Sequence, residues 1–201
     1  MSIPFTLDGQ PLQALDGETI LKAAQRHGVD IAHLCFKDGY RPDGNCRACV
    51  VEVQGERTLA PSCCRSVTPG MEVQARSPRA RKSQQMVVEM LLSDMPDQGY
   101  KWIGDDANQP HGELSEWAAQ MDVQVRPELR ALRRTQPAPD VSHPAMAVNL
   151  DACIQCNRCV RACREEQVND VIGYALRGAD SKIVFDLDDP RAESSCVACG
   201  E

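Results

Sequence analysis

The first quarter of the chain alternates between strand-like and helix-like patterns of apolar residues. Residues 3–7 and 11–15 alternate around Asp8-Gly9, a tight-turn dipeptide, which predicts a β-hairpin. Apolar positions then recur at helical spacing between Asp16 and Gly28, which predicts one short amphipathic helix. Three later stretches are predicted to be strands: 49–53, which is rich in valine, and the strand-like 57–60 and 71–75.

The middle of the chain predicts helices joined by polar segments. Residues 78–94 form a helical pattern with Pro78 near its start. Its predicted buried face carries four apolar side chains: Met86, Val87, Met90 and Leu91. Met95 follows at near-helical spacing and is also expected in the core. A second short helix is predicted around 113–121, and the basic run 126–134 is expected to be a solvated face.

The last part of the chain begins after a proline-rich linker at 137–140. Residues 147–150 predict a strand that leads into a cysteine-rich loop. A helix is expected after Cys163, and residues 182–186 predict a further strand.

Composition and charge restrict the classes of protein that fit. Aromatic residues make up only 4% of the 201 positions, so a large aromatic core is not expected. A net charge of −7 disfavours a nucleic-acid binder. The chain has no apolar run of about 18 residues and no basic-then-apolar leader, so we expect a cytoplasmic protein without a membrane span.

Ten of the eleven cysteines fall into three compact groups. Tight spacings of this kind in a cytosolic chain indicate metal ligands or redox groups rather than disulfides. Several thiolates that converge from short loops are typical of iron–sulfur ligation, which predicts one-electron transfer. The groups are Cys35, Cys46, Cys49 and Cys63; Cys153, Cys156, Cys159 and Cys163; and Cys196 with Cys199.

The first group predicts a [2Fe–2S] cluster held by Cys35, Cys46, Cys49 and Cys63. A zinc site is the alternative, but zinc sites usually pair two short CxxC turns and this group has one. Cys64 could replace Cys63 as the fourth ligand. Neighbouring residues in an extended segment face opposite ways, so we choose Cys63 and expect Cys64 to be a small buried residue.

The second group has the C-x2-C-x2-C-x3-C spacing of bacterial two-cluster ferredoxins, although Arg164 stands where proline usually follows. In that pattern the fourth cysteine binds the other cluster. The prediction is therefore one [4Fe–4S] cluster on Cys153, Cys156 and Cys159, and a second on Cys163, Cys196 and Cys199. Each would lack one ligand, so the ferredoxin-like domain is expected to be truncated at its C-terminus.

Three stretches carry a resemblance to a known family. They are "LCFKDGYRPDGNCRACVVEV", "LAPSCCR" and "HPAMAVNLDACIQCNRCVRACREEQVNDVIGYALRG". They resemble the N-terminal iron–sulfur region of the catalytic alpha subunit of cytosolic NAD-dependent formate dehydrogenases. That family is related to the large iron–sulfur subunit of complex I and to the diaphorase subunits of soluble hydrogenases.

The resemblance implies an α+β chain with three parts. Residues 1–77 would form a [2Fe–2S] β-grasp ferredoxin-like domain, 78–140 a helical and irregular linker, and 141–201 a bacterial-type 2[4Fe–4S] ferredoxin-like domain. Some relatives carry a further cluster bound by one His and three Cys. The chain has no cysteine between Cys64 and Cys153, so that cluster is expected to be absent.

The resemblance also implies a function. The chain would relay electrons between a formate-oxidising molybdenum or tungsten bis-pterin site, absent from these 201 residues, and a flavin- and iron–sulfur-containing partner that reduces NAD. Its partners would be the remaining catalytic region of the same subunit and those NAD-reducing subunits, with no nucleic acid or membrane. No residue of this chain is expected to be catalytic. The alternatives are a diaphorase subunit of an NAD-linked hydrogenase and a non-redox zinc-binding module.

Overall fold

The computed structural model describes residues 2–96 and 112–200, and the described chain divides into two compact units. Unit 1 takes in Met1–Lys37, Arg41–Glu89 and Trp117–Val123. Unit 2 takes in Asp38–Tyr40, Met90–Glu116 and Gln124–Glu201. Each unit has its own sheet, and each is described by itself.

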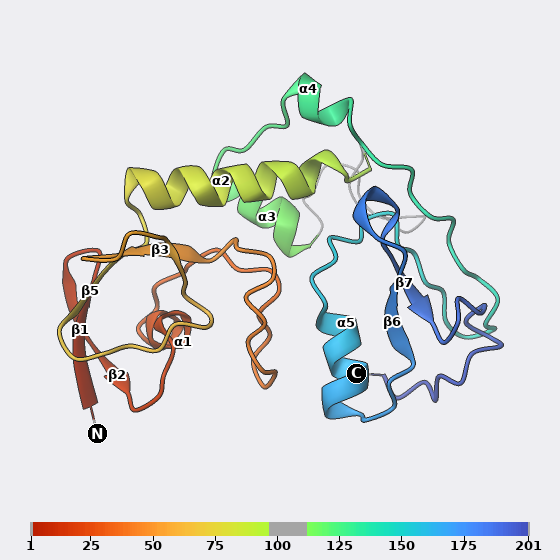
Figure 1. Cartoon of the computed structure of the whole chain (residues 1–201), viewed down its shortest axis with the longest axis horizontal. Coiled ribbons are helices and arrows are strands. Elements are labelled where there is room, and N and C mark those ends of the chain that lie inside the picture. Colours follow the sequence, from red (N-terminus) through yellow and green to blue (C-terminus); the bar gives the residue numbers. More distant parts are fainter. Residues whose placement is uncertain (1, 97–111, 201) are drawn as a thin grey trace. The chain divides into compact units, whose positions relative to one another are not determined.

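Unit 1 is built on a five-stranded sheet in the order β2-β1-β5-β3-β4 (Figure 1). Strands β1 and β5 are parallel, and the other neighbouring pairs are antiparallel. The core of this unit is formed by the apolar side chains of the sheet and of helix α1. The elements are β1 (Ser2–Leu7), β2 (Gln10–Leu15), α1 (Ile20–Arg26), β3 (Val50–Val53), β4 (Ala60–Pro61) and β5 (Met71–Gln74).

Local sequence signals explain where α1 begins and ends. The Thr19 hydroxyl accepts a hydrogen bond from the backbone N–H of Lys22 at 3.3 Å, which caps the first turn. Gly28 follows the last turn with φ of 72°, a conformation that costs glycine little. The buried side chains Ile20, Leu21, Ala23 and Ala24 lie on the face that enters the core.

Most of the predicted elements of unit 1 are present. The hairpin, the helix and the strands at 49–53 and 71–75 are confirmed. The predicted strand at 57–60 is wrong, because only Ala60–Pro61 pairs with β3. The chain turns at Gly55, where φ is 84°, and Pro61 has no N–H to extend the ladder.

The long helix α2 (Pro78–Ser93) and the short helix α3 (Glu113–Gln120) are both confirmed, but the predicted buried face of α2 is wrong. Met86 and Met90 are exposed, whereas Gln84 and Val88 are buried. The Gln84 amide donates hydrogen bonds to the backbone oxygens of Val50 and Ala75, which ties this face to the sheet. Met95 is buried, as expected.

Unit 2 is centred on a two-stranded antiparallel sheet of β6 and β7, with Ile172 opposite Phe185. The strand at 182–186 is confirmed, while β6 was not predicted. The predicted strand at 147–150 is wrong, since only Val148 forms a single bridge, to Asp140. The elements are α4 (Pro127–Arg130), α5 (Arg158–Arg161), the π-helix η1 (Ala162–Glu166), β6 (Ile172–Ala175), the 3-10 helix η2 (Gly178–Asp180) and β7 (Lys182–Phe185).

The helix predicted to follow Cys163 starts earlier than expected. Helix α5 begins at Arg158 and passes directly into η1, so Cys159 and Cys163 both lie on the helical segment.

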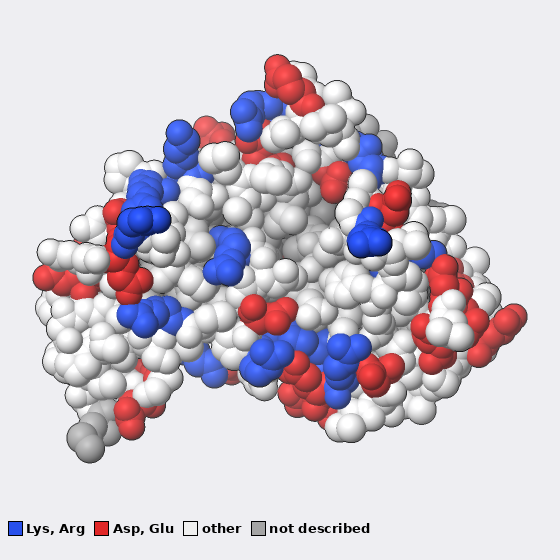
Figure 2. Space-filling model, in the orientation of Figure 1, with Lys and Arg blue, Asp and Glu red and all other residues white. Residues whose placement is uncertain are grey.

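Charged residues of both signs are interspersed on the face of the molecule shown in Figure 2. Within residues 2–96 and 112–200, no helix has the length and apolar character needed to cross a membrane.

Candidate functional site

Unit 1 brings the four cysteines of the first group together as two linked pairs. The Cys35 thiol interacts with that of Cys46, and the Cys49 thiol interacts with that of Cys63. A further contact between Cys35 and Cys63 joins the pairs. The backbone N–H of Cys35 also points to the Cys46 sulfur at 3.4 Å. Three of the four residues are buried, and Cys46 is partly exposed.

The pKa values of the four thiols are shifted in opposite directions. Hydrogen bonds from the thiols of Cys46 and then Cys63 lower the pKa of Cys35. A hydrogen bond from Cys63 lowers the pKa of Cys49 to about 7. The donors show the opposite shift, because bonds to Cys35 raise the pKa of Cys46 and of Cys63. Each pair therefore combines one thiolate-favouring sulfur with one protonated donor, which is a set of groups that metal binding would deprotonate.

The loop between Cys35 and Cys46 depends on left-handed backbone conformations. Gly44 has φ of 63°, and Arg47, directly after Cys46, has φ of 61°. A Cβ atom on Gly44 would lie 2.9 Å from the Cys64 sulfur. Glycine is therefore favoured at this position chiefly by the backbone conformation, because the exposed Cys64 side chain could move away from a Cβ atom.

Cys64 is exposed, so the prediction that it would be a buried residue is wrong. Its sulfur lies 3.6 Å from the Cys63 sulfur and against Gly44. Cys63 is fully buried and interacts with Cys35 and Cys49. The two neighbours thus differ in environment, and Cys63 is the one whose thiol joins the other three.

The sulfur arrangement differs from that of a site for a single metal ion. Among residues 2–96 and 112–200, no three His, Cys, Asp or Glu side chains converge closely enough to hold a single metal ion. A [2Fe–2S] cluster needs two thiolates on each of two irons, so its four sulfurs form two pairs. The thiol contacts run in the order Cys46, Cys35, Cys63 and Cys49, an arrangement that can be divided into two such pairs.

Unit 2 holds the other six cysteines around two loops and one helical segment. Cys159 is an exposed residue, but the atoms packed around its sulfur desolvate the thiol and raise its pKa to about 11, and the nearby sulfurs of Cys156 and Cys153 add to the rise. These three therefore lie near one another. The Cys163 sulfur is buried and accepts a hydrogen bond from the backbone N–H of Val171 at 3.3 Å.

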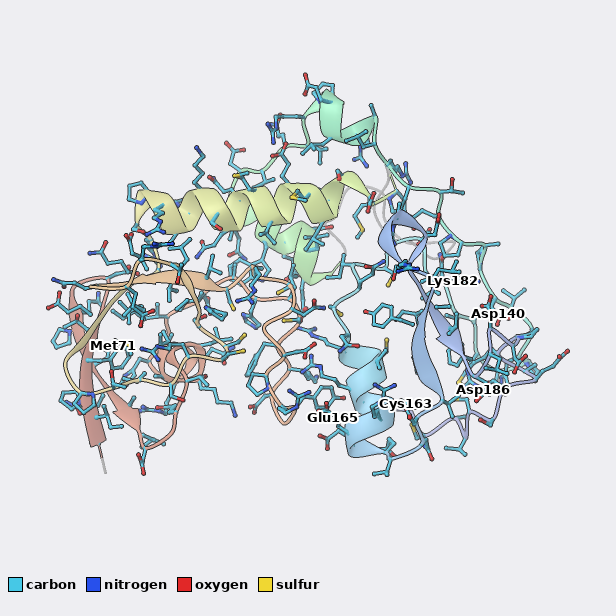
Figure 3. All side chains as sticks on the ribbon, viewed as in Figure 1. Met71, Asp140, Cys163, Glu165, Lys182 and Asp186 are labelled. Carbon is cyan, nitrogen blue, oxygen red and sulfur yellow. The ribbon has the colours of Figure 1, made fainter. Side chains whose placement is uncertain are left out.

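Cysteines from two groups line one small cavity of ≈ 50 Å³. Cys159 and Cys163 reach it from the helical segment, and Cys196 and Cys199 reach it from the last loop. Figure 3 labels Cys163 on that helical segment, near strand β6. The structure thus brings Cys163, Cys196 and Cys199 together, and it adds Cys159, which the spacing had assigned to the other cluster. The assignment of these sulfurs to clusters remains a prediction.

The two C-x-x-C loops of unit 2 share a pattern of left-handed residues. The residue before the second cysteine has φ of 54° in Gln155 and 55° in Ala198. The residue after it has φ of 66° in Asn157 and 83° in Gly200. This match indicates that the third cysteine group is a structural repeat of the start of the second.

Arg134 is a positioning residue that the sequence did not reveal. Its side chain is only 13% exposed, and its guanidinium donates to the backbone oxygens of Cys153 at 2.6 Å and Ser181 at 3.2 Å. It also pairs with Asp94, with 3.4 Å between Nε and Oδ2. The solvated face expected for 126–134 is therefore wrong at Arg134.

Asp186 plays a similar part for the last loop. Its carboxylate accepts hydrogen bonds from the Ser195 backbone N–H at 2.6 Å and the Ser195 hydroxyl at 2.8 Å. These bonds lower the pKa of Asp186. They hold the residue that precedes Cys196. Asp186 lies at the end of β7, and only its position in the fold shows this role (Figure 3).

Comparison with known proteins gives the relatives of the chain. Residues 1–78 match the family "2Fe-2S iron-sulfur cluster binding domain". The chain is 32% identical to the NADP-reducing hydrogenase subunit HndD of Solidesulfovibrio fructosivorans, covering 99% of this chain and 34% of the relative. It is 30% identical to the mitochondrial NADH dehydrogenase (ubiquinone) iron–sulfur protein 1 of Solanum tuberosum, covering 90% of this chain and 24% of the relative. It therefore spans about a third or less of these relatives.

A solved structure resembles the chain over almost its full length. It is a chain of an NAD+-reducing [NiFe]-hydrogenase, with a TM-score of 0.81 and 26% identity, and the match covers 98% of this chain and 81% of that one. The resemblance supports an α+β fold with a ferredoxin-like first domain. Residues 1–78 thus resemble a 2Fe–2S iron–sulfur cluster-binding domain, and the chain is similar in sequence to the hydrogenase subunit HndD and to the iron–sulfur protein 1 of NADH dehydrogenase.

Proposed function

We propose that this chain is an iron–sulfur electron-transfer module of an NAD-linked oxidoreductase. The observation that carries the proposal is the arrangement of four thiols as two linked pairs in unit 1. It is supported by the family match of residues 1–78. The printed names of the relatives add to that support, because they describe an NADP-reducing hydrogenase and an NADH dehydrogenase.

The proposed ligands follow the pairs and cavities described above. A [2Fe–2S] cluster would be held by Cys35, Cys46, Cys49 and Cys63. [4Fe–4S] clusters would be held by Cys153, Cys156 and Cys159, and by Cys163, Cys196 and Cys199. When bound, such clusters accept and release single electrons.

The rest of the chain buries some of these sulfurs and orients the loops that carry them. The buried positions of Cys35, Cys49 and Cys63 shield the first group from solvent. In unit 2, the Val171 N–H donates to the Cys163 sulfur, and hydrogen bonds of this kind tune the reduction potential of a ligated centre. Arg134 and Asp186 hold the two loops that present the cysteines.

Two hosts for the module are proposed. The three stretches that carry the sequence resemblance support the alpha subunit of an NAD-dependent formate dehydrogenase, whose formate-oxidising bis-pterin site would lie outside these residues. The relationship to HndD and to the NAD+-reducing [NiFe]-hydrogenase supports a hydrogenase diaphorase. In either case the partners would be flavin-containing subunits that reduce NAD.

The first experiment tests the cofactor class. Anaerobically purified chain is assayed for iron, acid-labile sulfide and zinc, and is then reduced for electron paramagnetic resonance. The proposal expects iron and sulfide in equal amounts and the rhombic signal of one reduced [2Fe–2S] centre. Colourless protein with stoichiometric zinc and no sulfide would instead establish the zinc-binding module.

The second experiment separates the hosts. Disrupting the gene in its native organism and measuring NAD reduction in extracts tests both electron donors. Loss of formate-dependent NAD reduction alone assigns the chain to a formate dehydrogenase. Loss of hydrogen-dependent NAD reduction alone assigns it to a hydrogenase. If both activities persist, both host assignments are wrong.

A further inference from the structure

Unit 1 contains a cavity of ≈ 420 Å³ that none of the thiols lines. Its walls come from the segment before Cys35, from the end of β5, from α2 and from α3. The Gln85 amide donates to the Met121 backbone oxygen at 3.1 Å, which holds α2 and α3 side by side at this place (Figure 1). The lining residues used below are Asp30, Arg76, Arg81, Gln84, Trp117 and Gln120.

The charged side chains of this cavity favour an anion. Arg76 and Arg81 contribute two guanidinium groups, and Asp30 contributes one carboxylate. Arg76 is 71% exposed and makes one long ion pair to Asp8, at 4.0 Å. Both arginines are exposed residues of a chain whose net charge is −7, and a guanidinium group matches phosphate oxygens in geometry and charge.

Gln84 adds a side-chain amide to the lining of the cavity. Its side chain is 6% exposed, and its Nε2 donates to the Val50 and Ala75 backbone oxygens at 2.8 and 3.3 Å. Among residues 2–96 and 112–200, no donor reaches its Oε1. An amide oxygen without a protein donor can accept from a ligand that brings an N–H or O–H.

Trp117 supplies a flat apolar wall. It is partly buried, and its ring lies 6.1 Å from the ring of His33 at an interplanar angle of 60°. Trp117 is also one of the residues that line the cavity. Indole faces bind planar rings by offset stacking, and the amide of Gln120 is available beside it.

We propose that this cavity binds a nucleoside monophosphate. Arg76 and Arg81 would hold the phosphate, the face of Trp117 would stack on the base, and the Gln84 oxygen would accept from the base or ribose. Asp30 would accept from a ribose hydroxyl. The volume lies within the range of small-molecule sites, roughly 300–1,000 Å³. The proposal does not depend on which clusters the chain carries.

The site also contacts the segment that leads to the first thiol. Ile31 and Ala32 line the cavity and lie three residues or more before Cys35. His33 follows them, and its ring meets Phe36 edge-on at 5.8 Å. A nucleotide in the cavity would therefore stiffen the chain next to the candidate [2Fe–2S] ligands.

The test is isothermal titration of the full 201-residue chain with adenosine monophosphate, adenosine and inorganic phosphate. We expect saturable one-to-one binding of the monophosphate, and at least tenfold weaker binding of each half-ligand. The Arg76→Gln/Arg81→Gln variant should bind the monophosphate at least tenfold more weakly, about the effect of losing one charge-assisted hydrogen bond. Trp117→Leu should weaken monophosphate and adenosine binding but leave phosphate binding unchanged.

Lys82→Gln is the matched control, because it removes one positive charge from an exposed neighbour of Arg81 that does not line the cavity. It should bind the monophosphate within about twofold of the wild type. Circular dichroism of each variant checks that the fold is retained. The proposal is overturned if no saturable monophosphate binding is seen up to about 10 mM, a limit near −3 kcal/mol. It is also overturned if the arginine variant binds like Lys82→Gln, or if phosphate alone binds as tightly as the monophosphate.

Discussion

Replacing Arg134 by alanine should loosen the loop that carries Cys153. The substitution removes two hydrogen bonds from a charged donor, to the backbone oxygens of Cys153 and Ser181, and the ion pair with Asp94. Each charge-assisted bond contributes roughly 1.5–3 kcal/mol before water replaces it. Because the side chain is only 13% exposed, water replaces these bonds poorly, and we expect a net loss of about 2–4 kcal/mol.

Hydrogen exchange measures this loss without relying on bound iron. A change of about 2–4 kcal/mol corresponds to a roughly 30- to 700-fold faster exchange of the amides around Cys153. Arg134→Lys keeps the charge but loses the forked geometry, so it should lie between alanine and wild type. Arg177→Ala, at an exposed position, is the control and should exchange like wild type. Equal exchange in the Arg134→Ala and Arg177→Ala variants would refute the positioning role.

Three further predictions concern unit 1. Cys63→Ser should abolish or strongly perturb the reduced [2Fe–2S] resonance signal while Cys64→Ser leaves it unchanged; the reverse pattern would show that Cys64 is the ligand. Gly44→Ala should lower the iron content of the same centre, because the left-handed backbone costs alanine about 1–2 kcal/mol and its Cβ would meet the Cys64 sulfur at 2.9 Å. If Gly44→Ala binds iron as fully as wild type, that loop is not constrained as described. Glu18→Gln should lower the thermal midpoint slightly, by the amount of a water-screened ion pair, since a hydrogen bond from Arg26 lowers the pKa of Glu18 below 4.5. Because the folded pKa is lowered, the ion pair stabilises the protein fully above pH 4.5, and this stability is lost as pH falls through the folded value. The difference in thermal midpoint between Glu18→Gln and wild type should therefore stay constant from about pH 8 to about pH 5.5. A difference that disappears within that window would contradict the shift.

The sequence predicted the parts of the fold that local signals control. The Asp8-Gly9 turn with its flanking alternation, and the capped helix after Thr19, were both found where expected. The buried face of α2 could not be predicted in this way. Gln84 is buried there because its amide meets two backbone oxygens from β3 and from the end of β5, and such partners are visible only in the folded chain.

Strand 147–150 failed for a related physical reason. An apolar, β-branched stretch becomes a strand only when a partner is available along its length. Here Val148 meets Asp140 in a single bridge, while the Asp140 carboxylate accepts from the backbone N–H of Ser142 and of Arg191. The stretch is thus held by isolated bonds to loops rather than by a ladder.

Cysteine spacing predicted some features of the candidate sites and not others. Short spacings place thiols on one loop, so the three groups were visible in the sequence. Spacing does not predict the environment of each cysteine. Cys64 adjoins Cys63 in the sequence, but its exposure and its contact with Gly44 are visible only in the structure. Arg134 and Asp186 carry no sequence signal at all, because they act through the backbone of residues distant in the chain.

The repeated backbone of the two C-x-x-C loops argues that unit 2 is shaped for a bound group. All four residues around the second cysteines adopt the left-handed conformation. It costs Asn157 and Gly200 little, but it costs Gln155 and Ala198 about 1–2 kcal/mol each. Strain of this size persists where the surroundings over-determine the backbone, which is common at ligand sites. Tyr174 donates to the Gln155 backbone oxygen at 3.1 Å, and Asp186 holds Ser195 ahead of the second loop. Two loops far apart in sequence therefore maintain the same costly conformation with different supports, which is expected if both must present cysteines to the same kind of cluster.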